Sequence, residues 1–232
     1  RSIDVKRSIA GHQLEWIVNK KLKLSLNETV IYAFRGLDFN YLVPIIPFYP
    51  IENYLGDTDN LQMGFDLELK ASEYQTMYLS FFMDELTPEW LFRSKNHNWF
   101  AWQIGYFSKK ILNKNLIWGF EYNWTDQRIY KHKFKVNNFY SHNQPLGFWA
   151  GPHAQELIFF ANKNLGDKEI EIKITTLKRG LNEKSSILDN YKDIHLPRFD
   201  PSIIVEEKVI RSIYLTKHFN NIFSYKITIS NI

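Results

Sequence analysis

The sequence contains no cysteine, which excludes disulfide bonds and cysteine-ligated metals. No apolar run approaches the roughly 20 residues that a membrane-spanning helix needs, and the mean hydropathy is negative. Phosphate-binding glycine loops, dinucleotide fingerprints, nucleophile elbows and zinc motifs are also missing. These absences exclude a helical membrane protein and weaken an enzymatic function. They leave a membrane β-barrel open, because the residues that face a barrel's lumen keep its average composition polar.

Aromatic residues are the clearest excess, with 18 Phe, 13 Tyr and 7 Trp making up 16% of the chain. Such a content is typical of aromatic girdles at a membrane interface, or of surfaces that stack on sugar rings. Hydrophobic residues account for 44%, which argues against a disordered chain. The net charge of +4 is scattered rather than gathered into a basic stripe, so no nucleic-acid partner is predicted.

The most regular pattern lies between Asn60 and Lys70, where apolar and polar residues alternate without exception. A strand with this period of two has one apolar face and one polar face. Its length exceeds the about 5–6 residues usual for soluble strands and matches the roughly 9–11 residues of a strand that crosses a bilayer. We expect its leucines to face lipid, and Gln62, Asp66 and Glu68 to face a lumen.

Similar alternation along the chain predicts about ten strands and no long helix. The predicted strands are Ser8–Trp16, Leu22–Phe34, Asn60–Lys70, Thr76–Leu86, Trp99–Lys110, Leu116–Thr125, Glu156–Lys163, Lys168–Lys178, Ile203–Lys217 and Asn221–Ile232. Their connections alternate between short turns and long loops, and the long loops lie near 36–58, 87–98, 127–155 and 180–202.

Short turns at one end and long loops at the other are the plan of an outer-membrane barrel. The predicted fold class is therefore all-β: a single antiparallel transmembrane β-barrel domain over residues 1–232. With this plan the last strand runs outward, whereas such barrels normally finish on the inner side. We therefore expect the barrel to be incomplete, with further strands beyond both ends of the chain.

The loop near 36–58 is unusually apolar for a connection between strands. Pro44, Pro47 and Pro50 prevent regular strand pairing within it, yet most of their neighbours are apolar. We expect this loop to fold into the barrel mouth or to pack on its rim. A contact between copies of the protein is the alternative.

Chemically versatile side chains are densest between Glu121 and Pro152. The candidate ligand-binding residues in this stretch are Arg128, Tyr130, His132, Tyr140 and His142. Aromatic rings stack on sugar faces and cations pair with acidic groups, so a polysaccharide is the predicted partner. The alternative is that the same side chains brace a long loop through hydrogen bonds and packing.

Neither catalysis nor metal binding is predicted, and no cofactor is expected. His132, His142 and His153 lack a supported metal-ligand spacing. Asp84 and Glu85 begin a carboxylate cluster that also includes Glu89. Adjacent strand residues point to opposite faces, so the first two cannot act as a simple catalytic pair, and a strand end at a polar rim explains them.

Four stretches follow one another in a recognisable order: Ser8–Trp16, Glu28–Pro50, Tyr54–Phe65 and Glu121–Leu157. Their motif residues are Gly11, His12, Glu15, Asp59, Asn60, Gly64, Gly147, Gly151 and Pro152, together with two Tyr-x-His triplets at 130–132 and 140–142. In this order the chain resembles the capsule assembly Wzi family. The resemblance implies a β-barrel in the bacterial outer membrane that holds capsular polysaccharide at the cell surface, as a lectin and not as an enzyme.

Three other functions stay open. A channel for small solutes requires an open lumen, and a membrane-embedded hydrolase requires converging carboxylates or a Ser/His pair. A soluble β-protein requires the apolar faces of its strands to pack in a closed core. In a barrel those faces form an outward band about 25 Å tall instead, with outer-membrane lipid as the partner. The sequence makes no prediction about the oligomeric state.

Overall fold

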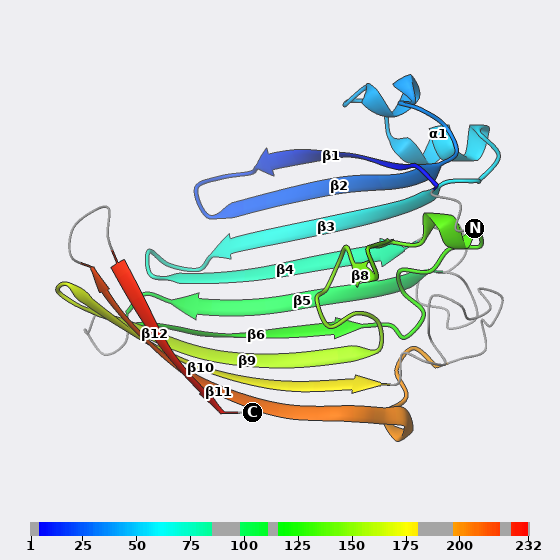
Figure 1. Cartoon of the computed structure of the whole chain (residues 1–232). Coiled ribbons are helices and arrows are strands. Elements are labelled where there is room, and N and C mark those ends of the chain that lie inside the picture. The colour runs from blue at the N-terminus through cyan, green and yellow to red at the C-terminus, as the bar shows by residue number, and fades with distance from the viewer. Residues whose placement is uncertain (1–4, 85–97, 111–115, 181–196, 219–223, 232) are drawn as a thin grey trace.

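The computed structural model describes residues 5–84, 98–110, 116–180, 197–218 and 224–231. They form one ten-stranded antiparallel sheet in which each strand pairs with its neighbours in chain order (Figure 1). The strands are β1 (Arg7–Ile17), β2 (Leu22–Ala33), β3 (Asn60–Lys70), β4 (Gln75–Asp84), β5 (Trp99–Ser108), β6 (Ile117–Thr125), β9 (Ala154–Leu165), β10 (Lys168–Gly180), β11 (Ile204–His218) and β12 (Ser224–Asn231). The prediction of an all-β, antiparallel fold is confirmed.

The sheet is curved and open. Within the described part of the chain, β1 and β12 each pair with a single neighbour and form the two edges (Figure 1). Closure into a barrel is therefore not observed.

Short and long connections lie at opposite ends of the sheet, as predicted. The described short turns span 18–21, 71–74 and 166–167, and the fully described long segments span 34–59 and 126–153. Figure 1 shows both long segments at the same end of the sheet. The loops expected near 87–98 and 180–202, and the turns near 111–114 and 218–220, fall mostly or wholly outside the described residues.

The long segments contain short elements that the two-residue period does not predict. They are the helix α1 (Phe48–Tyr54), the 3-10 helices η1 (Phe39–Leu42), η2 (Lys135–Asn137) and η3 (Pro201–Ile203), and the hairpin of β7 (Tyr140–Ser141) with β8 (Gln144–Pro145). Pro50 fits α1 because it lies in the first turn, where backbone N–H groups have no partner within the helix. No helix in the described ranges has the length and apolar character needed to span a membrane.

Strand register sorts the side chains onto two contrasting faces. On one face an apolar row crosses the sheet: Leu24, Leu67, Leu79, Ile104 and Tyr122 lie directly opposite one another on successive strands. Aromatic rings extend this apolar face, for example Trp102 and Tyr122, whose ring centroids are 5.0 Å apart. The face stays largely uncovered, since Ile104 is 42% exposed and Phe159 is 49% exposed.

The opposite face is polar. The next residues along the same strands form a row of Ser25, Asp66, Ser80, Gln103, Asn123 and Glu156. Asp66 accepts hydrogen bonds from Ser25 at 3.0 Å and from Asn27 at 3.1 Å. Asn123 donates to Glu156 at 3.0 Å. The middle of this face is therefore lined by polar groups that bind one another.

The burial of the apolar side chains of β3, the most regular segment, shows whether they pack in a closed core. Leu61 is buried beneath the 34–59 segment, but Met63, Phe65 and Leu67 are only partly buried, and Leu69 is exposed. These side chains do not pack into a closed core.

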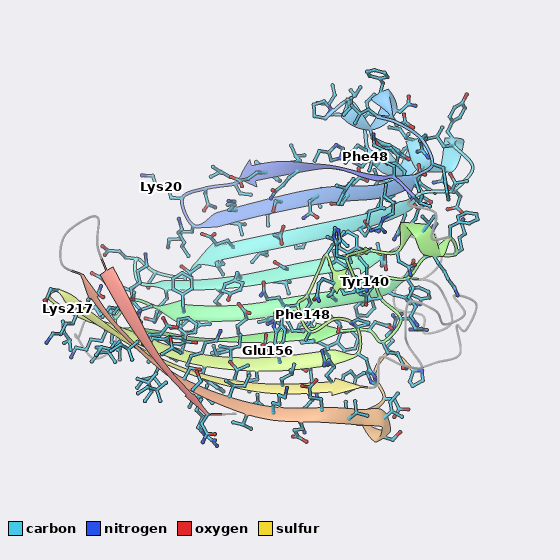
Figure 2. The ribbon with its side chains drawn as sticks, in the orientation of Figure 1. Lys20, Phe48, Tyr140, Phe148, Glu156 and Lys217 are labelled. Atoms are coloured by element: carbon cyan, nitrogen blue, oxygen red, sulfur yellow. The ribbon has the colours of Figure 1, made fainter. Side chains whose placement is uncertain are left out.

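The tightly packed residues gather at the long-segment end of the sheet. On the apolar face, Tyr41 and Phe48 pack against Val30, Tyr32 and Leu61. The Pro-rich loop therefore packs on the apolar face of the sheet, at its long-segment end. On the polar face, the second cluster comprises Ile31, Trp99, Ala101, Ile129, Tyr130 and Phe139. Figure 2 shows Phe48 near the end of β2, and Tyr140 and Phe148 over the middle strands.

Candidate functional site

The 126–153 segment is anchored at its base by Asp126, which is fully buried. Its carboxylate accepts hydrogen bonds from Arg128 Nε at 3.0 Å and Nη2 at 2.8 Å, and from Arg198 Nη1 at 3.0 Å. Its backbone carbonyl accepts from the N–H of His153 at 3.3 Å. Asp126 thus holds the two ends of the segment together through its backbone carbonyl, and its carboxylate binds Arg198 of the chain that precedes β11. Sequence reasoning missed Asp126, because Arg198 lies 72 residues away.

Tyr130 holds the middle of the same segment against the sheet. Its ring is buried, its backbone N–H donates to the Asp84 carboxylate, and its phenol oxygen accepts from the N–H of Phe148 at 2.8 Å. A Cβ added to Gly147 would lie 2.4 Å from that phenol oxygen, so no side chain fits there without a shift. The Leu-Gly motif is thereby explained by packing.

His132 is buried as well, with 2% of its surface exposed. Its backbone N–H donates to the side-chain oxygen of Asn138 at 2.8 Å. Its ring Nδ1 accepts a hydrogen bond from the backbone N–H of Phe134 at 3.1 Å. Burial lowers the pKa of His132 to about 4, so the imidazole is neutral near pH 7.

The five candidate ligand-binding residues do not form one surface. Arg128, Tyr130 and His132 are buried and brace the 126–153 segment. Tyr140 is partly buried, which raises the pKa of its phenol to about 12, and His142 is exposed. Bracing thus accounts for the first three side chains, while a ligand contact from Tyr140 and His142 stays a prediction.

Acidification is expected to destabilise the protein through His132. Its pKa is about 4 in the folded state but about 6.5 in an unfolded chain, so the unfolded state binds more protons between these values. The free energy of unfolding should fall as pH drops from about 6.5 to about 4, by on the order of 1–3 kcal/mol in total. Urea unfolding in detergent at pH 8 and at pH 5 measures this loss.

The control is His132→Gln, which cannot titrate. The burial of Glu52 raises its pKa to about 7, and this group acts in the opposite direction over an overlapping range. Because Glu52 is present in both proteins, its effect cancels in the comparison. Equal losses of stability in the wild type and His132→Gln would contradict the prediction.

Several motif residues connect the 34–59 segment, called the Pro-rich segment below, to the strands that it packs against. His12 Nε2 lies 2.9 Å from Glu28 Oε2, and the ring of Phe48 lies over the imidazole with centroids 4.1 Å apart. Glu28 also accepts from the backbone N–H of Phe48 at 2.6 Å. A polar pair on the otherwise apolar face is thus covered by the start of α1.

Asp59 and Asn60 connect the two long segments. Asp59 accepts from Arg35 Nη1 at 2.8 Å and from the phenol of Tyr41 at 2.7 Å. Asn60 donates to the carbonyl of Asn137 at 2.7 Å. The Asp-Asn motif at the start of β3 therefore binds the Pro-rich segment with one residue and the 126–153 segment with the next.

The remaining glycine motifs mark close approaches. A Cβ on Gly64 would lie 2.2 Å from Asn27 Oδ1. Gly151 adopts a φ of 79°, and its carbonyl accepts from Thr125 Oγ1 at 2.9 Å, with Pro152 buried beside it. These residues set the path of the backbone next to the polar face.

Two motif residues of β1 have no such role. Glu15 forms an ion pair with Lys23 at 2.6 Å, with both side chains over 40% exposed. A Cβ on Gly11 would have its nearest neighbours at 3.4 Å, so nothing in the structure explains a glycine there.

The three histidines considered for a metal site, His132, His142 and His153, each contact different residues. His153 accepts a hydrogen bond from the N–H of Asp200 at 3.0 Å and contacts the ring of Phe199. In the described ranges, no group of three or more His, Asp or Glu side chains is placed to hold a metal ion.

The carboxylate cluster is divided between described and undescribed residues. Asp84 is buried and accepts hydrogen bonds from Gln62 and from the N–H of Tyr130. This is a structural role at the end of β4. Glu85 and Glu89 lie outside the described residues.

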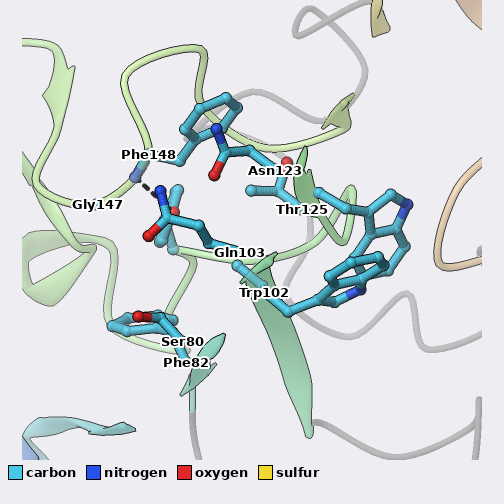
Figure 3. Close-up of a pocket in the computed structure, with 11 residues that line it drawn as sticks. Ser80, Phe82, Trp102, Gln103, Asn123, Thr125, Gly147 and Phe148 are labelled. Atoms are coloured by element: carbon cyan, nitrogen blue, oxygen red, sulfur yellow. Dashed lines mark hydrogen bonds between the residues drawn. The ribbon is translucent and has the colours of Figure 1, made fainter. Parts of the chain in front are cut away.

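Two hollows on the polar face meet at Ser80. The first, of about 200 Å³, is lined by Ser80, Phe82, Ala101, Trp102, Gln103, Asn123, Trp124, Thr125, Tyr130, Gly147 and Phe148. The second, of about 400 Å³, is lined by Gln13, Lys23, Ser25, Asp66, Leu67, Glu68, Tyr78, Leu79 and Ser80. Because they share Ser80, we treat them together as one groove, the Ser80 groove, whose lining residues run across the strands from β1 to β6. Figure 3 shows Gln103 and Asn123 between Phe148 and the pair Ser80 and Phe82.

A separate hollow of about 730 Å³, the rim hollow, lies between the Pro-rich segment and β1, β2 and β3. Its apolar lining comes from Leu14, Leu26, Pro44, Ile45, Pro47 and Met63. It therefore opens among residues of the apolar face, whereas the Ser80 groove belongs to the polar one.

No protein-family model, curated protein or solved structure matches this chain, so its family stays an expectation that rests on the order of its sequence motifs.

Proposed function

We propose that this chain forms wall strands of a bacterial outer-membrane β-barrel of the Wzi type, which binds surface polysaccharide on its polar inner face without catalysis. The contrast between the two faces of the sheet carries the proposal. Polar side chains across the middle of one face bind one another, and an apolar cluster lies beneath the 126–153 segment at one end of that face. On the other face, large apolar and aromatic side chains lie uncovered. A barrel wall has this arrangement, with lipid against the apolar side and a wet lumen on the other.

Lipid contact accounts for features that a soluble protein would not tolerate easily. Large exposed apolar patches on soluble proteins are rare unless they bind something. Here exposed apolar side chains recur on the apolar face from Leu14 on β1 (69% exposed) to Ile229 on β12 (67% exposed), although Lys178, Glu207 and Arg211 interrupt it on β10 and β11. The rim hollow adds an apolar recess that would lie against lipid at the long-segment end. Closure would also give the edges β1 and β12 their missing partners.

The Ser80 groove suits a sugar chain. It offers the hydroxyl of Ser80, the amides of Gln103 and Asn123, and the aromatic rings of Tyr78 and Phe148. Sugar rings present hydroxyls at their edges and C–H groups on their faces, so they use hydrogen-bonding groups and aromatic rings together. Two hollows that adjoin at Ser80 would offer successive positions for the units of a polymer.

A channel for small solutes is the alternative that shares the same wall. The 126–153 segment covers part of the polar face at one end of the sheet, which disfavours a wide opening. Glycan binding and liposome conductance of the full chain in vesicles separate the two functions. We expect binding to surface polysaccharide without hydrolysis, and conductance without glycan binding would overturn the proposal.

Gln103→Ala removes an amide from the groove and should weaken glycan binding about tenfold, the loss expected for one good hydrogen bond. Asn164→Ala is the matched control. Asn164 lies on the polar face of β9, next to the turn at 166–167, and it is exposed and does not line the groove. Equal effects of the two variants would place the binding site elsewhere.

A further inference from the structure

The polar face lacks positive charge along its centre. On β4, β5, β6 and β9, all of which the structure describes in full, the residues that share the face of Ser80 include no Lys, Arg or His. The same positions carry the carboxylates Glu121 and Glu156, besides the buried Asp84. A ligand that crosses these strands therefore meets negative and neutral groups only.

The carboxylates near the groove are held by neutral donors. Glu121 accepts from the phenol of Tyr78 at 2.5 Å and from the amide of Asn123 at 2.8 Å. Glu156 accepts from Asn123 at 3.0 Å and from the indole of Trp149 at 3.2 Å. Such hydrogen bonds position the oxygens without neutralising them; the cation that acts on Glu156 is Lys173 of β10, which does not line the groove.

At the other end of the groove, Asp66 and Glu68 add two more carboxylates. Lys23 is the single cation among the residues that line the described groove, and Glu15 already pairs with it at 2.6 Å. The negative balance of the central strands thus continues along the whole groove.

No Lys, Arg or His of the 126–153 segment is among the residues that line the Ser80 groove, and three of these side chains have partners elsewhere. Arg128 pairs with Asp126 inside the protein, and Lys133 pairs with Asp57 of the Pro-rich segment. His132 is buried among backbone and amide partners. None of these three side chains lines either hollow of the Ser80 groove.

We infer that the Ser80 groove selects a polysaccharide without negative charge, either neutral or amino-bearing, and disfavours uronic-acid or phosphate-bearing chains. This rests on the proposed function and names the ligand class of the same site. An acidic sugar would bring its carboxylate close to Glu121 and Asp66, and Lys23, the one cation among the described lining residues, already pairs with Glu15. Like charges brought together out of water repel. Sugar hydroxyls and ammonium groups instead donate charge-assisted hydrogen bonds to these carboxylates.

The test measures binding of three hexasaccharides of equal length to the full chain in detergent by calorimetry: an N-acetylglucosamine oligomer, a glucosamine oligomer and a galacturonate oligomer. We expect the neutral or the amino oligomer to bind at least tenfold more tightly than the acidic one. Raising the salt concentration should narrow that difference, because exposed charges are screened.

Glu121→Gln tests the source of the selectivity. It should strengthen binding of the acidic oligomer several-fold relative to the other two, while keeping the shape of the side chain. Glu121 acts on the groove through its hydrogen bonds with the lining residues Tyr78 and Asn123. The matched control is Glu171→Gln, the same change on the polar face of β10, a strand that supplies none of the lining residues, and it should leave the ratios unchanged.

The outcomes separate this inference from the function on which it rests. Tightest binding of the acidic oligomer, or ratios that do not respond to Glu121→Gln, would overturn the charge selectivity while leaving a glycan-binding protein. If no oligomer binds, and a wider panel of surface polysaccharides also fails to bind, both the selectivity and the proposed function are wrong.

Discussion

Replacing Ile104 by arginine is expected to cost about 2–4 kcal/mol of folding free energy in a lipid bilayer, the penalty of a cation on the lipid face near the midplane of a barrel. Ile104 lies midway along β5 on the apolar face and is 42% exposed. In a soluble protein, the same change at so exposed a position should stay within about ±0.5 kcal/mol. Urea-dependent folding into phospholipid vesicles measures the difference.

Gln103→Arg is the matched control for this experiment. It introduces the same side chain one residue earlier on the same strand, at the same depth, but on the polar face. The barrel proposal predicts a much smaller penalty for it. Equal, small effects of both variants in a protein that folds without detergent or lipid would show that the apolar face does not meet lipid, and the soluble alternative would replace the proposal.

Asp126→Asn should be the most damaging conservative change in the 126–153 segment, at about 3–5 kcal/mol, because it leaves two guanidinium groups facing an uncharged partner. Arg128 is 1% exposed, and Arg198 has 16% of its side chain exposed. We expect the segment to detach from the polar face before the sheet unfolds, so proteolysis within it should speed up along with the loss of stability.

The control for Asp126 is an ion pair of similar length at the surface. Lys23 and Glu15 lie 2.6 Å apart on the polar face with side chains 42% and 43% exposed. Glu15→Gln should therefore have a much smaller effect on the free energy of unfolding, because exposed pairs contribute little. Similar costs for Asp126→Asn and Glu15→Gln would show that the buried carboxylate does not anchor the segment.

Strand positions were predictable because alternation is a local property of the chain. The predicted strand Asn60–Lys70 has the same bounds in the structure, and Lys168–Lys178 is extended only to Gly180. The Pro-rich segment was harder, because its apolar residues have no period of two. Its short helix α1 and the contact of Phe48 with His12 depend on packing against the sheet.

The candidate binding residues were only partly predictable. Residue type singled out Arg128, Tyr130 and His132, but residue type does not show whether a side chain faces a ligand or a partner within the protein. Arg128 faces a partner within the protein, the carboxylate of Asp126. No spacing in the sequence predicts that the same carboxylate also binds Arg198. That these side chains brace the 126–153 segment could be recognised only from such contacts between residues distant in sequence.

By itself, the sequence determined the all-β class, the strand segments, the two contrasting faces and the placement of short and long connections at opposite ends, because all of these follow from periodicity and turn residues along the chain. Only the tertiary structure decided which polar residues come together. Ser80, Gln103, Asn123 and Glu156 are far apart in sequence and become neighbours through the register of four strands. That register results from packing and hydrogen bonding between strands, which no local pattern encodes.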